Sequence, residues 1–362
     1  MKYLNKDDDP ASSNSNQTLL SVEDERQLGN ERKRLFIVTA SLSIICGIII
    51  SVSGAQVRII FTNLPETISS GFALIFSVIF LLLHLRLRNA KEEKEGGKKY
   101  NNKGKASSSQ LPSIPLSTPY KNKVHIPFTI GLALWFTAEL VYSYYQIVLK
   151  IEVPFPSVAD PVFLIGYGFF AYSFYMVLRY MKRLVDREVI VFVSLAVCTS
   201  LSFILYLSMG IGQLMVPVTD QLSNILSITY PVLDGVLFVP ALVILWSINR
   251  TSIQENLVFT HWVFVSAFII LNAIGDVGYG YNVIVGSINE NEWIWDIFYN
   301  AAYITIAAAL FWQVRNYRFL SELIQSKEKI QREGQAKTKG SVSVQNIAGE
   351  IKSGNSNQQY DI

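Results

Sequence analysis

The chain has 362 residues, of which 50% are hydrophobic and only 16% are charged, and its formal net charge is +3. Soluble domains carry about 25% charged residues. Here the charges lie in blocks between long apolar runs, which indicates an integral membrane protein rather than a nucleic-acid-binding one. The two cysteines, Cys46 and Cys198, both lie within apolar runs, so neither a disulfide framework nor a zinc site is predicted.

Eight apolar stretches are long enough to cross a bilayer, which takes about 20 residues. In chain order they are 35–54, 70–87, 127–149, 159–179, 189–209, 224–247, 262–284 and 294–314. With the N-terminus inside, only Arg58 and Lys150 of the 31 lysines and arginines lie outside, as the positive-inside rule requires. We therefore expect an all-α, polytopic protein of the cell membrane with about eight transmembrane helices and both termini in the cytoplasm.

The polar segments between these stretches divide the chain into parts. The expected parts are a disordered cytoplasmic N-terminus (1–34), a helical pair (35–87), a low-complexity cytoplasmic linker (88–126), a six-helix membrane domain (127–314), an amphipathic cytoplasmic helix (315–333) and a disordered tail (334–362). The first apolar stretch is expected to act as an uncleaved anchor. We expect the six-helix domain to fold as the functional unit without the first pair.

The acids and tyrosines of the third and fourth stretches recur in the seventh and eighth. Glu139 and Asp160 are 21 residues apart, and Asp276 and Asp296 are 20 residues apart. A tyrosine follows each leading acid by three residues and each trailing acid by seven, at Tyr142, Tyr279, Tyr167 and Tyr303. With Tyr230 and Asp234 as a weaker copy, the last six helices are predicted to be three hairpins repeated in parallel. Chance recurrence is the alternative.

All five of these carboxylates should lie in the outer half of the bilayer. A charged side chain there costs about 2.5–3.5 kcal/mol on insertion scales, so each acid is expected to face protein or water. Polar residues one helical turn away extend the acids into stripes. The candidate ligand-binding residues of this outward-facing pocket are Glu139, Asp160, Asp234, Asp276, Asp296, Tyr142, Tyr167, Tyr230, Tyr279, Tyr303, Asn272 and Asn300.

Purely structural roles for these acids remain open. Asp160 and Asp296 lie near predicted helix starts, where an acid caps the helix and suits its dipole. Glu139, Asp234 and Asp276 lie too deep for capping, and the alternative for them is interhelical hydrogen bonding worth about 0.6 kcal/mol per contact.

No catalytic set accompanies the acids. The three histidines, His84, His125 and His261, all lie at cytoplasmic ends, away from the predicted pocket. Nucleophile-elbow, metalloprotease and phosphate-loop patterns are absent from the sequence. We therefore expect no enzymatic activity and no cofactor, while a carboxylate-bound cation such as calcium stays open.

Five short motifs, in this order, resemble a known family. They are "LWFTAEL", "PFPSVADPVFLIGYG", "YPVLDGVLFVP", "GDVGYGY" and "WDIFYNAAY". They resemble the multi-helix membrane sensor domain found N-terminal to bacterial diguanylate cyclases and histidine kinases. The matching features are Trp135 with Glu139, Pro156-Ser157 with Asp160, Tyr230-Pro231 with Asp234, Gly275-Asp276, and Asp296 with its tyrosines. The resemblance covers about 125–315 and implies a sensor-like module, here without an output domain.

The combined interpretation is a sensor-like membrane protein that binds a small ligand or cation from outside and signals through a separate partner. Its expected partners are the lipid bilayer and a cytoplasmic signalling protein, or a second copy of the chain held through 315–333. No nucleic acid is expected. The rival function is a proton- or cation-coupled transporter or channel subunit, which the mostly apolar inner halves of the helices disfavour.

Overall fold

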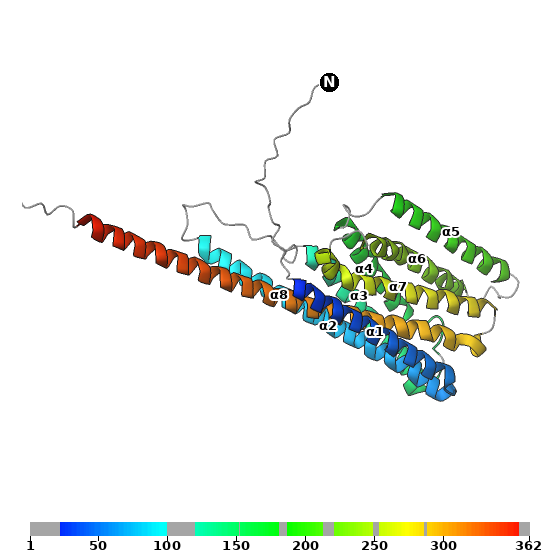
Figure 1. The fold of residues 1–362 in the computed structure, drawn as a ribbon. Helices are drawn as coiled ribbons and strands as arrows, with labels where there is room; N and C mark the ends of the chain where they lie inside the picture. Colours follow the sequence, from blue (N-terminus) through cyan, green and yellow to red (C-terminus); the bar gives the residue numbers. More distant parts are fainter. Residues whose placement is uncertain are drawn as a thin grey trace, which may run out of the picture.

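The computed structural model describes residues 22–99, 120–151, 153–180, 187–212, 221–248, 253–285 and 288–354, and all their regular elements are helices. The helices are α1 (Val22–Val52), α2 (Ala55–Lys99), α3 (Tyr120–Ser143), η2 (Tyr144–Leu149), α4 (Asp160–Tyr180), α5 (Arg187–Gly212), α6 (Gln221–Ile248), α7 (Ile253–Val285) and α8 (Ile288–Gly354). η2 is a π-helical turn that continues α3. Figure 1 shows them gathered in a bundle, from which α8 extends.

Seven helices of the described chain are long and apolar enough to cross a membrane. These segments are Arg26–Val52, Gln56–Arg86, Lys123–Leu149, Asp160–Arg179, Thr229–Trp246, Thr260–Gly280 and Trp293–Leu323. They confirm the all-helical class and are compatible with a multi-pass membrane protein. The eighth expected span, 189–209, coincides in position with α5, but α5 is not among these seven.

The second span is longer than its hydropathy predicted. The sequence placed it at 70–87, whereas the membrane-length segment of α2 begins at Gln56. Thr62, Asn63 and Glu66 lower the local hydropathy, and in the structure all three hydrogen-bond to neighbouring helices. Their polarity is satisfied inside the bundle, so the segment is helical where a loop was predicted.

The C-terminal segment also differs from the prediction. α8 continues without interruption to Gly354, through most of the segment 334–362 that was expected to be disordered. Good helix formers such as Glu, Lys, Gln and Ala are frequent in this stretch, and they favour helix despite its Gly and Ser content. Of the predicted linker, 100–119 lies outside the described residues, while α2 and α3 take up its two ends.

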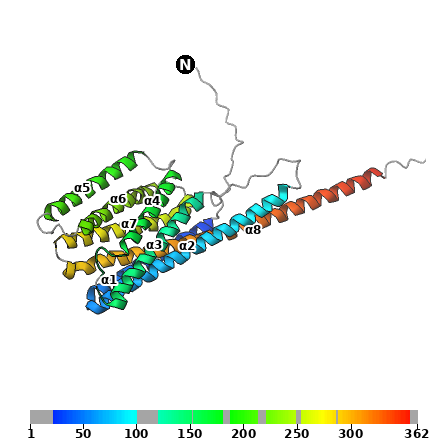
Figure 2. The same ribbon diagram turned by 180° about the vertical axis from the view of Figure 1, so that it is seen from behind.

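Helix α8 occupies the centre of the packing. It contacts α7, α2 and α1, and Arg315 on α8 forms a two-pronged ion pair with Glu31 on α1. Figures 1 and 2 show α5 at the edge of the bundle, where it contacts α6 and α7. Both views also show the end of α2 running beside α8 as the two leave the bundle.

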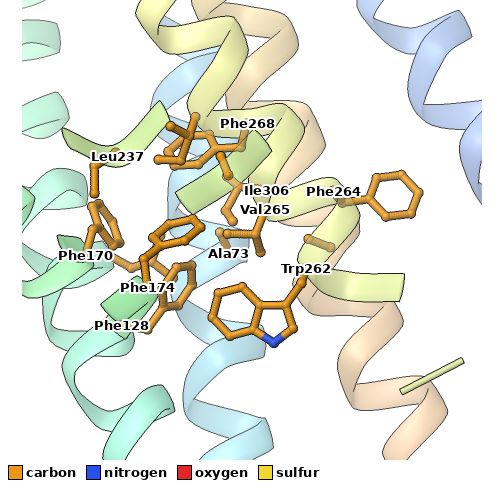
Figure 3. Close-up of a cluster of buried hydrophobic side chains, with 14 of the residues drawn as sticks. Ala73, Phe128, Phe170, Phe174, Leu237, Trp262, Phe264, Val265, Phe268 and Ile306 are labelled. Atoms are coloured by element: carbon orange, nitrogen blue, oxygen red, sulfur yellow. The ribbon is translucent and has the colours of Figure 1, made fainter. Parts of the chain in front are cut away.

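The middle of the bundle is filled by large apolar side chains, which Figure 3 shows converging from several helices. The fully buried aromatic residues among them are Phe128, Phe170, Phe174, Trp262 and Phe268. Most of their ring contacts are edge to face, for example between Phe128 and Trp262, whose centroids are 5.8 Å apart, which is a favourable arrangement for aromatic pairs. This apolar layer separates two groups of buried polar residues at the two ends of the bundle.

Close packing in this layer depends on a small residue on α4. The indole of Trp135 on α3 lies against Gly166, where an added Cβ would come within 2.4 Å of the ring. Glycine is therefore needed at this contact for steric reasons. The resulting approach lets Trp135 donate to the backbone oxygen of Phe163 at 3.3 Å.

Candidate functional site

Six carboxylates gather at the end of the bundle where α4 and α8 begin. They are Glu66, Glu139, Asp160, Asp234, Asp276 and Asp296. Four tyrosine hydroxyls donate to them, those of Tyr167, Tyr230, Tyr299 and Tyr303. We call these ten side chains the acid–tyrosine network.

Asp160 combines a helix-start role with a contact to another helix. One of its oxygens accepts from the Ser157 backbone N–H at 2.5 Å and from the Ser157 hydroxyl at 3.0 Å. The other accepts from the hydroxyl of Tyr230 on α6 at 2.7 Å. The side chain is 1% exposed, so this acid belongs to the interior of the bundle as well as to the start of α4.

The centre of the network is a pair of aspartates that share one tyrosine. The Tyr167 hydroxyl on α4 lies 2.6 Å from Asp234 Oδ1 on α6 and 3.1 Å from Asp276 Oδ2 on α7. Tyr299 on α8 donates to Asp276 Oδ1 at 2.7 Å. The two carboxyls are also within hydrogen-bonding reach of each other. Four helices therefore meet at this point.

A second group of acids lies between α2, α3 and α8. The Tyr303 hydroxyl donates to Glu139 Oε1, and Asn300 Nδ2 donates to Glu66 Oε1 at 2.9 Å. The Thr62 hydroxyl donates to Asp296 Oδ2 at 3.2 Å. Glu66 lies close enough to Glu139 and Asp296 to interact with their charges.

Most of the residues that the sequence singled out meet in this network. Nine of the twelve take part in the hydrogen bonds just described: Glu139, Asp160, Asp234, Asp276, Asp296, Tyr167, Tyr230, Tyr303 and Asn300.

Three predicted residues lie at the margin. Tyr142 hydrogen-bonds to Ser157, and its ring lies 5.8 Å from that of Phe163. Tyr279 lies near Tyr142. Asn272 donates to a backbone oxygen of its own helix, that of Phe268, at 3.0 Å.

The sequence interpretation missed Glu66 and Thr62. Both were assigned to a loop because a hydropathy average discards polar residues. A signal for them exists in the spacing of buried residues on α2, at Asn63, Glu66, Ser70, Ala73, Ser77, Phe80 and His84. Steps of three and four residues mark a single helix face. Small and polar residues on that face indicate a helix packed inside a bundle.

The hydrogen bonds described above reach the network carboxylates from hydroxyls, from the Asn300 amide and from the Ser157 backbone N–H. Arg58, near the start of α2, bonds instead to the backbone oxygens of Ile50 and Ser53 at 3.2 and 3.1 Å. Its guanidinium also lies 5.6 Å from the Trp293 ring centroid. Within the described part of the chain, no group of three or more His, Cys, Asp or Glu is placed to hold a metal ion.

A second polar group, which we call the histidine cluster, lies on the other side of the apolar layer. It consists of His84, His125, His261, Gln313 and Tyr317. His84 Nδ1 lies 3.2 Å from the Tyr317 hydroxyl, and Gln313 Nε2 lies 3.2 Å from a ring nitrogen of His125. These are all three histidines of the chain, and each is buried. The sequence placed them apart from the acids but did not indicate that they meet.

Comparison of the chain with models of protein families, with curated proteins and with solved structures gives no match.

Proposed function

We propose that this chain is a non-enzymatic, sensor-like membrane protein. In this proposal the acid–tyrosine network takes up a small ligand or cation from the outer side. The resulting change passes along α8 to a separate cytoplasmic partner. The resemblance of residues 125–315 to bacterial membrane sensor domains points the same way. The observation that carries the proposal is the continuity of α8.

One unbroken helix connects the network, the histidine cluster and the segment outside the bundle. α8 contributes Tyr299 and Tyr303 to the network and Gln313 and Tyr317 to the cluster, and it ends at Gly354. At 1.5 Å per residue, the helix beyond Tyr303 is roughly 75 Å long. A shift or rotation of α8 at the network would therefore move a distant surface, as in other rigid-element switches.

The acids can drive such a shift because their mutual repulsion depends on whether a proton or cation is bound between them. Asp276 is bonded from both α4 and α8 and faces Asp234 on α6. A proton or cation that neutralises part of this charge changes the balance of forces among four helices. A ligand that binds one helix arrangement more tightly than another shifts the equilibrium between the two arrangements. The largest shift in free energy equals the difference between its two binding free energies.

A proton- or cation-coupled transporter or channel subunit is the alternative. Such a protein needs a polar route from the network to the opposite face. Between the two lies the layer of Phe128, Phe170, Phe174 and Phe268, all buried. This packing favours a sensor over a conduit.

Distance measurements between spin labels on α2 and α8 test the proposal. The exposed positions Arg86 and Ser326 would each carry a label, after Cys46 and Cys198 are changed to alanine. In proteoliposomes, pulsed electron paramagnetic resonance would compare distance distributions at pH 5 and pH 8, with and without calcium.

We expect one of these conditions to shift the distribution, and Asp276→Asn to remove the shift. Glu188→Gln, at an exposed acid on α5, serves as the matched control and should behave like the wild type. Identical distributions under all conditions and in all variants would show that α8 carries no signal.

A further inference from the structure

Four of the hydrogen bonds that join the first four helices to the last four form two matched pairs. Tyr167 on α4 donates to Asp276 on α7. In return, Tyr303 on α8 donates to Glu139 on α3. Tyr167 and Tyr303 each lie seven residues after the trailing acid of their hairpin, Asp160 or Asp296, and Glu139 and Asp276 are the leading acids of the two hairpins. The two bonds are mutual counterparts.

A second pair of contacts follows the same exchange. Tyr230 on α6 donates to Asp160, the first residue of α4, at 2.7 Å. Thr62 on α2 donates to Asp296, near the start of α8, at 3.2 Å. In each case a helix from one half bonds to the trailing acid of the other half.

The donors of that second pair also occupy equivalent places in their helices. Tyr230 lies four residues before the buried Asp234, and Thr62 lies four residues before the buried Glu66. Each helix carries a proline between its donor and its acid, Pro231 on α6 and Pro65 on α2. α2 therefore corresponds to α6.

The packing of the helices agrees with this correspondence. α2 packs on α3 as α6 packs on α7, and α3 packs on α4 as α7 packs on α8. α2 also packs on α8 as α6 packs on α4. The first helices of the two halves differ, because α1 packs on α8 while α5 packs on α6 and α7.

We propose that the chain consists of two four-helix halves, α1–α4 and α5–α8, related by an approximate two-fold axis along the bundle. Each half contributes the two acids of one proton-binding carboxyl pair, and the other half contributes the tyrosine beside it. The two equivalent pairs are Asp234 with Asp276 around Tyr167, and Glu66 with Glu139 around Tyr303. The arrangement replaces the predicted repeat of three hairpins, in which the first helical pair was an addition. Parallel repeats about an axis along the membrane normal are a known way to build membrane proteins. The inference deepens the proposed function, on which its biological meaning rests.

In the described part of the chain, the carboxyl oxygens of the first pair, Asp234 and Asp276, lack one hydrogen-bond donor. The Tyr167 hydroxyl has a single proton, so it satisfies either Asp234 or Asp276 at any moment. Asp234 is 4% exposed, and within the described residues its Oδ2 atom has no hydrogen-bond donor. A proton bound between the two carboxyls supplies the missing donor and removes one negative charge.

The second pair has an orphaned acceptor of its own. Asn300 is 1% exposed; its Nδ2 group donates to Glu66 Oε1, while its Oδ1 atom has no donor among the described residues. A proton on Glu66 gives the acid a hydrogen to donate, which the amide oxygen of Asn300 can accept. An orphaned buried oxygen therefore accompanies each carboxyl pair.

Among the residues that the structure describes, the titratable groups that face the two pairs are acids, tyrosines and one cysteine, none of which carries a positive charge. The first pair is surrounded by Tyr167, Tyr230, Tyr299 and Glu139, from α4, α6, α8 and α3. The second pair is surrounded by Tyr303 and Asp296 from α8, Asp276 from α7 and Cys46 from α1. Because the tyrosine hydroxyls already point at the carboxylates, and because the described residues offer no metal-holding group, a proton is the counter-charge that fits.

Infrared spectroscopy of the full-length protein in detergent at pH 7 tests this inference, because a protonated carboxyl has a carbonyl band separate from that of a carboxylate. We expect the wild type to show this band and each of Asp234→Asn and Glu66→Gln to remove about half of its area. The double variant should lose nearly all of it. Glu322→Gln, at an exposed acid on α8, is the control and should leave the band unchanged.

Absence of the band from the wild type, or no effect of Glu66→Gln, would overturn the two-site inference. If an acid variant does not fold, Tyr167→Phe and Tyr303→Phe keep all four carboxyls, and each should shift a different half of the band. A shift of the whole band by either variant would contradict two separate pairs. If the bands behave as expected while the α8 distances do not respond, the two sites stand and the proposed signalling function fails.

Discussion

The acid–tyrosine network and the histidine cluster bury polar groups in different ways. In the network, carboxylates accept from tyrosine hydroxyls, and among the described residues no lysine or arginine is hydrogen-bonded to these acids. In the cluster, imidazoles lie among aromatic rings, with the centroid of Phe80 4.7 Å from that of His125 and 5.2 Å from that of Tyr317. In the proposed function, a bound cation relieves charge repulsion in the first region, whereas packing and hydrogen bonds hold the second. The network is then the input region and the cluster is the anchoring region, on the same helices.

Removing α1 and α2 should have the largest effect, because α2 contributes to both regions. It gives Glu66 to the network and His84 to the cluster, and its Asn63 donates to Gln146 at 2.6 Å. These contacts lead us to the opposite of the sequence-based expectation that the six-helix domain folds alone. We predict that a chain beginning near residue 118 elutes as aggregate in size-exclusion chromatography. A chain that begins at residue 22 is the control, and a monodisperse truncated protein would contradict the prediction.

A substitution that overpacks the apolar layer between the two regions should lower the free energy of unfolding. Gly166→Ala places a Cβ 2.4 Å from the Trp135 ring, and overpacking of this kind costs about 3 kcal/mol. Gly168→Ala on the same helix meets nothing within 4 Å and should be neutral or stabilising by up to about 1 kcal/mol. Denaturation in detergent gives both values. Equal effects at the two positions would show that the contact of Trp135 with Gly166 is not tight.

Phenylalanine substitutions at two tyrosines of α8, one in each region, allow the polar interactions of the two regions to be compared directly. Tyr303→Phe removes the donor to Glu139, and hydrogen bonds to charged groups contribute about 1.5–3 kcal/mol. Tyr317→Phe removes the hydrogen bond to the His84 ring, and a typical hydrogen bond contributes about 0.5–1.5 kcal/mol. We expect the first variant to be the less stable in chemical unfolding. The reverse order would mean that the cluster, not the network, carries the stronger polar interaction.

The smallest effect is expected at Asp160. Asn caps helices about as well as Asp, so a purely capping role predicts little change in Asp160→Asn. Because Asp160 also accepts from Tyr230, we expect a loss of about 1 kcal/mol that disappears in a Tyr230→Phe background. A double-mutant cycle by thermal unfolding measures this coupling. If the effects of Asp160→Asn and Tyr230→Phe are strictly additive, Asp160 acts only as a helix cap.

The sequence alone was sufficient to predict an all-helical chain with several helices long and apolar enough to cross a membrane, because apolar stretches of bilayer length are a strong signal. It also pointed to acids and tyrosines that the structure brings together, since each lies on a helix face with other polar residues. It failed at Glu66 and Thr62, where hydropathy averaging hides a polar face. It also failed to pair the tyrosines, because Tyr167 and Tyr303 bond across the two halves. Such partners depend on helix rotation and packing, which periodicity within one helix does not encode.

The pH dependence of stability tests the central claim, that the network holds protons in its two carboxyl pairs. Free carboxyls of the unfolded chain are ionised above about pH 5. If the folded protein keeps protons that the unfolded chain releases, stability falls as the pH rises from 5 to 8. The slope is about 1.4 kcal/mol per pH unit for each proton. The account predicts this fall for the wild type, without dependence on calcium, and a flatter curve for the double variant Asp234→Asn, Glu66→Gln. Stability is measured by thermal melting at each pH. An equal change of stability between pH 5 and pH 8 in both proteins would contradict the account.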